Sequence, residues 1–128
     1  MPAQLEKQVL VLEDEAIIGL DLAEGLANAG FRPLGPFSTV ADALEMIEST
    51  RPHAAVLDID LGGGQTSLPV AERLIELGVP FLFLTGQSVR TTAVLDNFPA
   101  HTCLDKPVMP DELMASVSAM FAVEEEEA

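Results

Sequence analysis

Cysteine, tryptophan and tyrosine are nearly missing from this chain: Cys103 is the one cysteine, and neither of the other two residues occurs. A lone cysteine excludes an internal disulfide, which fits a reducing cytoplasm. Long apolar runs are missing too, since VPFLFL at Val79 to Leu84 is far shorter than the roughly 20 residues that cross a bilayer. The N-terminal MPAQLEKQ lacks the basic and then apolar order of a signal peptide. We expect a cytoplasmic protein with no membrane partner.

Positive charge is scarce as well, with 6 lysines and arginines against 21 acidic residues and a net charge of −15. Proteins that bind nucleic acid neutralise its phosphates with Lys and Arg, so this balance argues against nucleic acid as a partner. The 128 residues match the size of one domain. We expect residues 1–123 to form this domain and residues 124–128, which include the run Glu124 to Glu127, to be a disordered acidic tail.

Short apolar runs alternate with longer segments of helical spacing. Several runs are almost continuously apolar, as strands of a parallel sheet are when both of its faces are covered. The runs predict strands at Gln8–Leu12, Phe31–Gly35, His53–Asp58, Pro80–Thr85 and His101–Leu104. The spacing predicts helices at about Ile18–Ala29, Thr39–Ser49, Leu68–Leu77, Val89–Asp96 and Pro110–Ala122. Expected N-caps are Ser38 or Thr39 for the second helix and Ser67 for the third, and Gly30 and Gly78 are expected helix ends.

Five strands alternating with five helices predict an α/β domain with a parallel sheet. The flavodoxin-like (βα)5 three-layer sandwich, with strand order 2-1-3-4-5, is the expected arrangement. Ligands of such open sheets bind beyond the carboxyl ends of the strands, where the strand order reverses.

A set of polar residues falls at these strand ends. Glu13 and Asp14 follow the first strand, Asp58 ends the third, Thr85 ends the fourth, and Lys106 lies just beyond the fifth. Carboxylates within about 4 Å of one another repel by roughly 4 kcal/mol at an effective dielectric constant near 20, so such a cluster needs a cation. Oxygen ligands with open positions suit Mg²⁺. Asp58 could then attack a phosphoryl group, as other aspartyl nucleophiles do.

Four motifs in this order resemble the receiver domain of bacterial two-component response regulators. They are VLVLEDE at Val9 to Glu15, AVLDIDL at Ala55 to Leu61, FLFLTG at Phe81 to Gly86 and LDKPV at Leu104 to Val108. The similarity spans about residues 9–122. The segment PFLFLTG also resembles a stand-alone receiver subgroup with a P-F-x-F-x-T-G core, although the surrounding residues depart from it.

The resemblance implies a role for each residue of the set. Asp58 is the implied phosphoacceptor. Mg²⁺ is implied to bind Asp14 and Asp58 directly, Glu13 through water, and the backbone carbonyl of Asp60. Thr85 is implied to bind a phosphoryl oxygen. Lys106 is implied to pair with Asp58, held by a cis peptide bond to Pro107.

The implied function is phosphoryl acceptance from a histidine kinase or a histidine phosphotransfer protein, without turnover of an external substrate. We expect no output domain after the last helix, so the signal passes to a downstream regulatory protein by contact. One residue departs from the family pattern: Cys103 stands where many receivers carry an aromatic residue that moves on phosphorylation.

Other interpretations remain open for several residues. Glu13 and Asp14 could simply be the acidic start of a helix. Asp58-Ile59-Asp60 has the D-x-D spacing of haloacid-dehalogenase-like phosphatases, and a receiver that binds partners without being phosphorylated is a further alternative. Gly62 to Gly64 either line the approach to the site or form a plain loop. His53 and His101 lack the spacing of metal ligands and are expected at strand edges or the surface.

Overall fold

The computed structural model describes residues 7–86 and 103–127, and the side chains of this part up to Phe121. Predicted and observed elements agree closely within it. The strands are β1 (Gln8–Leu12), β2 (Arg32–Phe37), β3 (Ala54–Asp58), β4 (Phe81–Thr85) and β5 (Cys103–Asp105). The helices are α1 (Ala16–Asn28), α2 (Val40–Thr50), α3 (Leu68–Leu77) and α5 (Pro110–Glu127). The helix expected at Val89–Asp96 lies outside the described residues, as do His101 and the start of the fifth predicted strand.

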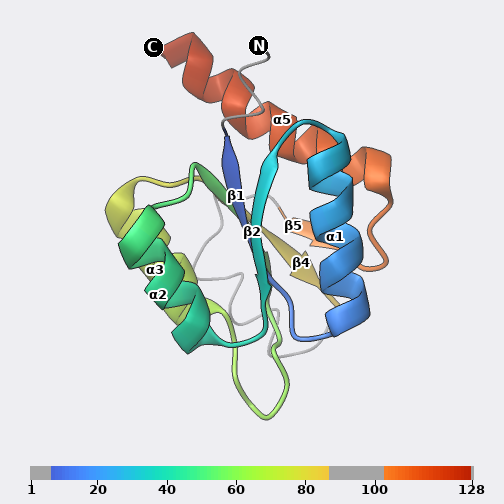
Figure 1. The fold of residues 1–128 in the computed structure, drawn as a ribbon, viewed down its shortest axis with the longest axis vertical. Coiled ribbons are helices and arrows are strands. Elements are labelled where there is room, and N and C mark those ends of the chain that lie inside the picture. Colours follow the sequence, from blue (N-terminus) through green and yellow to red (C-terminus); the bar gives the residue numbers. More distant parts are fainter. Residues whose placement is uncertain (1–6, 87–102, 128) are drawn as a thin grey trace.

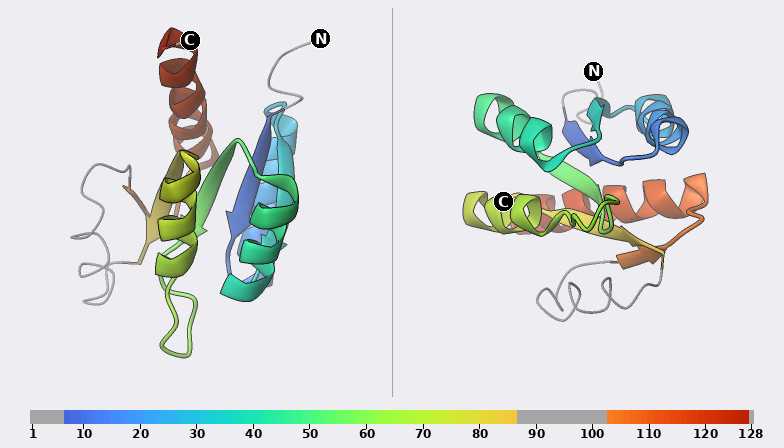
Figure 2. Two further views of the ribbon diagram at one scale, coloured as in Figure 1. Left: turned by 90° about the vertical axis from the view of Figure 1, so that its left-hand side faces the viewer. Right: turned by 90° about the horizontal axis from the view of Figure 1, so that it is seen from below.

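All strands of the sheet run parallel, in the order β2-β1-β3-β4-β5, which confirms the expected flavodoxin-like topology. Helices α1 and α5 cover one face, and α2 and α3 cover the other (Figures 1 and 2). The chain order therefore reverses between β1 and β3. Val11 pairs with Val56 across this point, and Asp58 pairs with Leu84 on the other side of β3.

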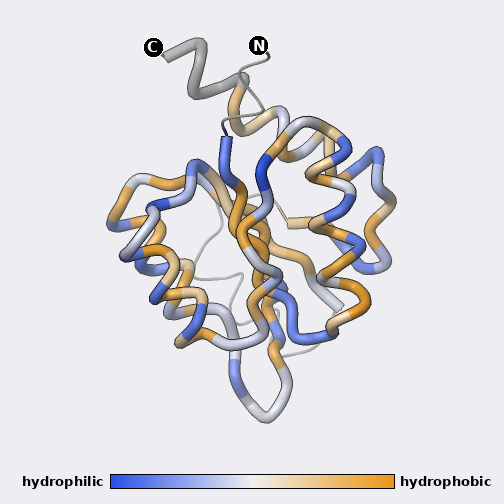
Figure 3. Tube along the Cα trace, in the orientation of Figure 1, coloured by the Kyte–Doolittle hydropathy of each residue, from blue (hydrophilic) through white to orange (hydrophobic). Residues whose placement is uncertain are grey.

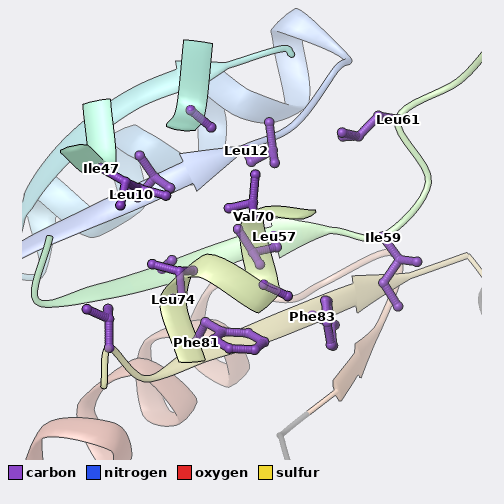
Figure 4. Close-up of a cluster of buried hydrophobic side chains, with 14 residues drawn as sticks. Leu10, Leu12, Ile47, Leu57, Ile59, Leu61, Val70, Leu74, Phe81 and Phe83 are labelled. Atoms are coloured by element: carbon purple, nitrogen blue, oxygen red, sulfur yellow. The ribbon is translucent and has the colours of Figure 1, made fainter. Parts of the chain in front are cut away.

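The core explains why the central strands are apolar along their whole length. Every residue of β3 and β4 is buried, because side chains alternate between two covered faces. One face packs Leu57 and Phe83 against α2 and α3 (Figure 4), and the other packs Val56 and Leu84 against α1 and α5. Apolar residues accordingly dominate the inner strands of the sheet (Figure 3).

The ends of α2 and α3 partly match the expected caps. The Thr39 hydroxyl accepts a hydrogen bond from the Asp42 N–H at 3.2 Å, so Thr39 is the N-cap of α2. Gly78 ends α3 in the left-handed region, with φ of 71°. Ser67 is the N-cap of α3, as predicted; its carbonyl accepts from the Val70 and Ala71 N–H groups, and its buried hydroxyl makes no capping hydrogen bond.

Helix α5 continues past the expected end at Ala122 and reaches Glu127. The predicted boundary was too early, because the residues after Ala122 include no glycine or proline and glutamate is a good helix former. Within residues 7–86 and 103–127, no helix combines the length and apolar character that a membrane span requires.

Two glycines of α1 lie in very different surroundings. A Cβ atom at Gly19 would lie 2.7 Å from the Cβ of Pro36, so α1 packs directly against β2 at this point. A Cβ atom at Gly25 would lie 3.7 Å from Met114 Cε of α5, an ordinary contact distance. Gly19 is therefore required by packing, whereas Gly25 is not.

Candidate functional site

Four strands bring polar side chains to one edge of the sheet, as the sequence predicted. Glu13 follows β1, Asp58 and Thr85 end β3 and β4, and Lys106 follows β5. The first three residues are 1%, 4% and 4% exposed, and they are three of the four buried polar or charged residues in the described part of the chain. Because burying polar groups is costly unless they are paired, their concentration here indicates a functional site.

Lys106 joins two of the carboxylates. Its Nζ atom lies 3.0 Å from Asp58 Oδ2 and 2.9 Å from Glu13 Oε1. The Lys106 backbone N–H donates to the Thr85 carbonyl at 2.9 Å, which ties the start of this loop to the end of β4. The peptide bond from Lys106 to Pro107 is cis, as the resemblance implied.

The acids also form a potential metal site. One oxygen from each of Glu13, Asp14 and Asp58 lies within 4.8 Å of the others. Glu13 Oε2 accepts a hydrogen bond from the Glu15 N–H at 3.1 Å, and the buried Oε1 is the atom that pairs with the Lys106 ammonium. The exposed Asp14 opens the cluster to solvent. Three clustered carboxylates, with only one ammonium beside them among the described residues, suit a hydrated divalent cation such as Mg²⁺.

Burial and charge shift the pKa values of the central pair. Burial is the largest influence on Asp58 and raises its pKa to about 7; the hydrogen bond from Lys106 lowers that pKa, and the nearby Glu13 carboxylate raises it. Burial lowers the pKa of Lys106, but contacts with Glu13 and Asp58 outweigh it, and the net shift is upward. The ammonium therefore stays charged, and Asp58 changes its protonation near neutral pH.

The loop after β3 is a hydrogen-bonded hairpin. Asp60 forms an antiparallel bridge with Thr66, and its side chain accepts a hydrogen bond from the Gly62 N–H at 3.0 Å. Gly62, Gly63 and Gly64 have φ angles of 80°, 58° and 83°, which only glycine adopts readily, so the glycines form the turn itself. A Cβ atom at Gly62 would lie 3.4 Å from Asp14 Oδ2, which places the turn beside the metal cluster.

Two further residues considered in the sequence, Cys103 and His53, are not part of the acidic cluster. Cys103, in β5, is half-buried and pairs with Phe83 across the sheet. His53 is exposed, as expected, and its Nδ1 accepts a hydrogen bond from the Gln8 N–H at 2.9 Å.

Sequence reasoning missed an apolar groove between α1 and α5. The groove has a volume of about 780 Å³. Its walls are mostly apolar, Asp21 and Glu24 also line it, and Lys106 lines it as well. Nearby, Ile17 and Leu20 of α1 are 77% and 60% exposed, and Met109 is 65% exposed. The sequence AIIGLDL at residues 16–22 could have indicated this surface. It has more apolar residues than the buried stripe of one amphipathic helix can hold, so some of them must be exposed.

No family model matches the chain. The chain is 29% identical over 124 residues to the phyllosphere-induced regulator PhyR of Methylorubrum extorquens, a match that covers 94% of this chain and 46% of PhyR. The chain thus spans about half the length of the curated relatives it matches.

Solved structures match along nearly the whole chain. SdrG from Sphingomonas melonis is 36% identical, with a TM-score of 0.78 and coverage of 91% of this chain and 98% of that one. The signal receiver domain of a modulated diguanylate cyclase from Desulfovibrio desulfuricans is 28% identical, with a TM-score of 0.82 and coverage of 94% and 98%.

Proposed function

Because the chain belongs to the receiver domains of two-component response regulators, we propose that it accepts a phosphoryl group on Asp58. One observation carries this proposal: a carboxylate that is 4% exposed at the end of β3 lies 3.0 Å from an ammonium and within 4.8 Å of two further acids. This arrangement supplies a nucleophile, a fixed positive charge and ligands for a divalent metal in one place.

The chain's own residues account for most of the chemistry. In the transfer, an Asp58 oxygen forms a bond to phosphorus while the phosphorus–nitrogen bond of a phosphohistidine breaks and its electron pair stays on the imidazole nitrogen. Such transfers pass through a loose transition state, so positioning and neutralisation of charge matter most. Lys106 offsets charge at the phosphoryl oxygens, and the Thr85 hydroxyl binds one of them.

Asp14, Asp58, Glu13 and the backbone carbonyl of Asp60 would hold Mg²⁺. When bound, the metal supplies neutralisation of the phosphoryl charge and a fixed geometry for the entering group. The three carboxylates and one ammonium of this site carry a net negative charge, which a divalent cation balances.

The phosphoryl donor in this proposal is a histidine kinase or a histidine phosphotransfer protein in the cytoplasm. Asp21 and Glu24 of α1 line the groove that Lys106 also lines, and Ile17 and Leu20 of the same helix are exposed, so a donor with apolar and basic residues on its helices fits this side of the molecule. Phosphorylated, the protein would act on a downstream regulatory protein by direct contact rather than by turning over a substrate.

The test is to add Mg²⁺ and acetyl phosphate and to measure the intact mass. The wild type should gain the mass of one phosphoryl group, and Asp58→Asn should not. Asp42→Asn, the same change at an aspartate outside the site, is the matched control and should be labelled like the wild type. Absence of label from every small donor and histidine kinase tried, or labelling of Asp58→Asn, contradicts the proposal. Rapid hydrolysis of an external phosphoester would instead favour a phosphatase.

A further inference from the structure

The groove between α1 and α5 carries two acidic side chains that have no ion-pair partner among the described residues. These are Asp21 and Glu24, which are both exposed. We propose that the groove binds a small cationic amphiphile, that is, a molecule with an apolar body and a protonated amine. Such binding requires no phosphoryl group on Asp58, so it does not depend on the proposed function.

The groove has the size and the lining of a small-molecule site. Its volume of about 780 Å³ falls within the roughly 300–1,000 Å³ of ligand pockets. Leu22, Leu84 and Leu113 line it and are 8%, 1% and 2% exposed, so they form its floor. Gly25 also lines the groove, and its missing side chain leaves room between α1 and Met114 of α5. An apolar chain bound here would be removed from water, which is favourable.

The unpaired charges lie on one side of the groove. Asp21 and Glu24 are three residues apart on α1, and side chains at this spacing are neighbours on a helix surface. The residues after Lys106 that line the opposite side are all uncharged, namely Pro107, Val108, Pro110, Leu113 and Met114. The groove therefore fits a ligand that carries its cation beside α1 and is apolar elsewhere.

Lys106 does not reverse this preference for a cation. It lines the groove, but its ammonium is already paired with Glu13 and Asp58, at 2.9 Å and 3.0 Å. An anionic ligand would meet the two unpaired carboxylates on α1, and the net charge of −15 would repel it further. A second copy of the chain, bound symmetrically through this groove, would bring the same carboxylates opposite each other. The charge pattern therefore favours a small cation over an anion or a second copy.

The experiment follows NMR signals of the protein during titration with octylamine, octanol and octanoate, which share an eight-carbon chain and differ in charge. We expect octylamine to shift the signals of Leu22, Gly25 and Met114 in a saturable way. Octanol should bind about fivefold more weakly, because it forms no ion pair with the two carboxylates, and octanoate should not bind. High salt should weaken the binding of octylamine much more than that of octanol.

A double variant tests the recognition of charge. Asp21→Asn combined with Glu24→Gln removes both carboxylates and should weaken octylamine binding about fivefold, to the level of octanol. The matched control is Asp42→Asn combined with Glu45→Gln, a pair of exposed acids with the same spacing on α2. This control should bind octylamine like the wild type.

A further variant tests the place of binding. Gly25→Leu puts a side chain into the groove and should abolish the binding of both octylamine and octanol. The proposal is overturned if octylamine causes no saturable shift, which would leave the groove as a surface for protein helices alone. It is also overturned if octanol binds as tightly as octylamine, or if either variant binds octylamine like the wild type. If Gly25→Leu does not fold, the double variant decides, because both of its changes are at exposed positions.

Discussion

The Lys106 backbone N–H donates to the Thr85 carbonyl at 2.9 Å, while the Lys106 side chain reaches back to Asp58 at 3.0 Å. The ends of β3, β4 and β5 are thereby linked through one residue. A substitution at any of these strand ends should therefore affect the other two, because Lys106 follows β5 and contacts the ends of β3 and β4.

The first prediction concerns the counter-charge that Lys106 supplies. Lys106→Met leaves the Glu13 and Asp58 carboxylates buried without a counter-charge. We expect the free energy of unfolding in EDTA to fall by about 3 kcal/mol. This value is near the low end of the loss seen when one partner of a buried ion pair is removed, because Lys106 is partly exposed. Mg²⁺ should restore part of the loss. Urea unfolding with and without Mg²⁺ measures both effects. Lys106→Arg keeps the charge and is the control; equal losses in the two variants would contradict the account.

The second prediction concerns pH. The pKa of Asp58 is about 7 in the folded protein and near its ordinary value of 3.8 in the unfolded chain. Between these values the folded state binds more protons, so the contribution of Asp58 to the free energy of unfolding falls as the pH rises from about 4 to 7, and is constant above that. Glu13, Asp14 and Lys106 surround the Asp58 carboxyl group. The net upward shift of the Lys106 pKa keeps the Lys106 ammonium charged throughout this pH range.

Asp58→Asn should therefore gain stability relative to the wild type as the pH rises from about 5 to 8. Thermal unfolding of both proteins in EDTA at several pH values measures this difference. Mg²⁺ should flatten the wild-type dependence, since a metal favours the ionised carboxylate. A difference in Tm that stays constant across the range would show that Asp58 does not titrate there.

The third prediction uses the two glycines of α1. Gly19→Ala forces a Cβ atom to within 2.7 Å of Pro36 and should lower the free energy of unfolding by about 1–3 kcal/mol. Gly25→Ala places its Cβ atom at an ordinary distance from Met114 and should raise it by about 0.5–1 kcal/mol, as expected for alanine in a helix. Urea unfolding of both variants gives the comparison. Changes of the same sign would show that the close contact between α1 and β2 is absent in solution.

The fourth prediction separates Thr85 from Cys103. Thr85 is buried at the end of β4, beside the proposed phosphoryl site, whereas Cys103 is half-buried in β5 and lacks the aromatic ring that moves in many receivers. Beryllofluoride, which mimics a bound phosphoryl group, should shift NMR resonances of β5 and α5 in the wild type and in Cys103→Ala. In Thr85→Ala these shifts should be much smaller. If the shifts were lost to the same large extent in Thr85→Ala and Cys103→Ala, the proposed difference between these two residues would be contradicted.

The sequence was a good guide wherever a property repeats along the chain. Continuous apolar runs predicted β1, β3 and β4 to within a residue or two, because a strand that is buried on both faces of the sheet is apolar along its whole length. It was a weaker guide at boundaries such as the end of α5, where neighbouring residues favour helix equally well. The cap position at Ser67 was predicted correctly, but packing decides where the serine hydroxyl points, and here it makes no capping hydrogen bond.

The meeting of four polar residues at one edge of the sheet could be predicted from the sequence. Parallel strands end at one edge, so Glu13, Asp58, Thr85 and Lys106 had to meet there once the strand order was known. Only the tertiary structure decided that Lys106 lies between Glu13 and Asp58, that the three glycines form a turn against Asp14, and that α1 and α5 leave a groove beside the lysine. These facts depend on distances between residues far apart in the chain. Packing determines those distances, and no local pattern encodes them.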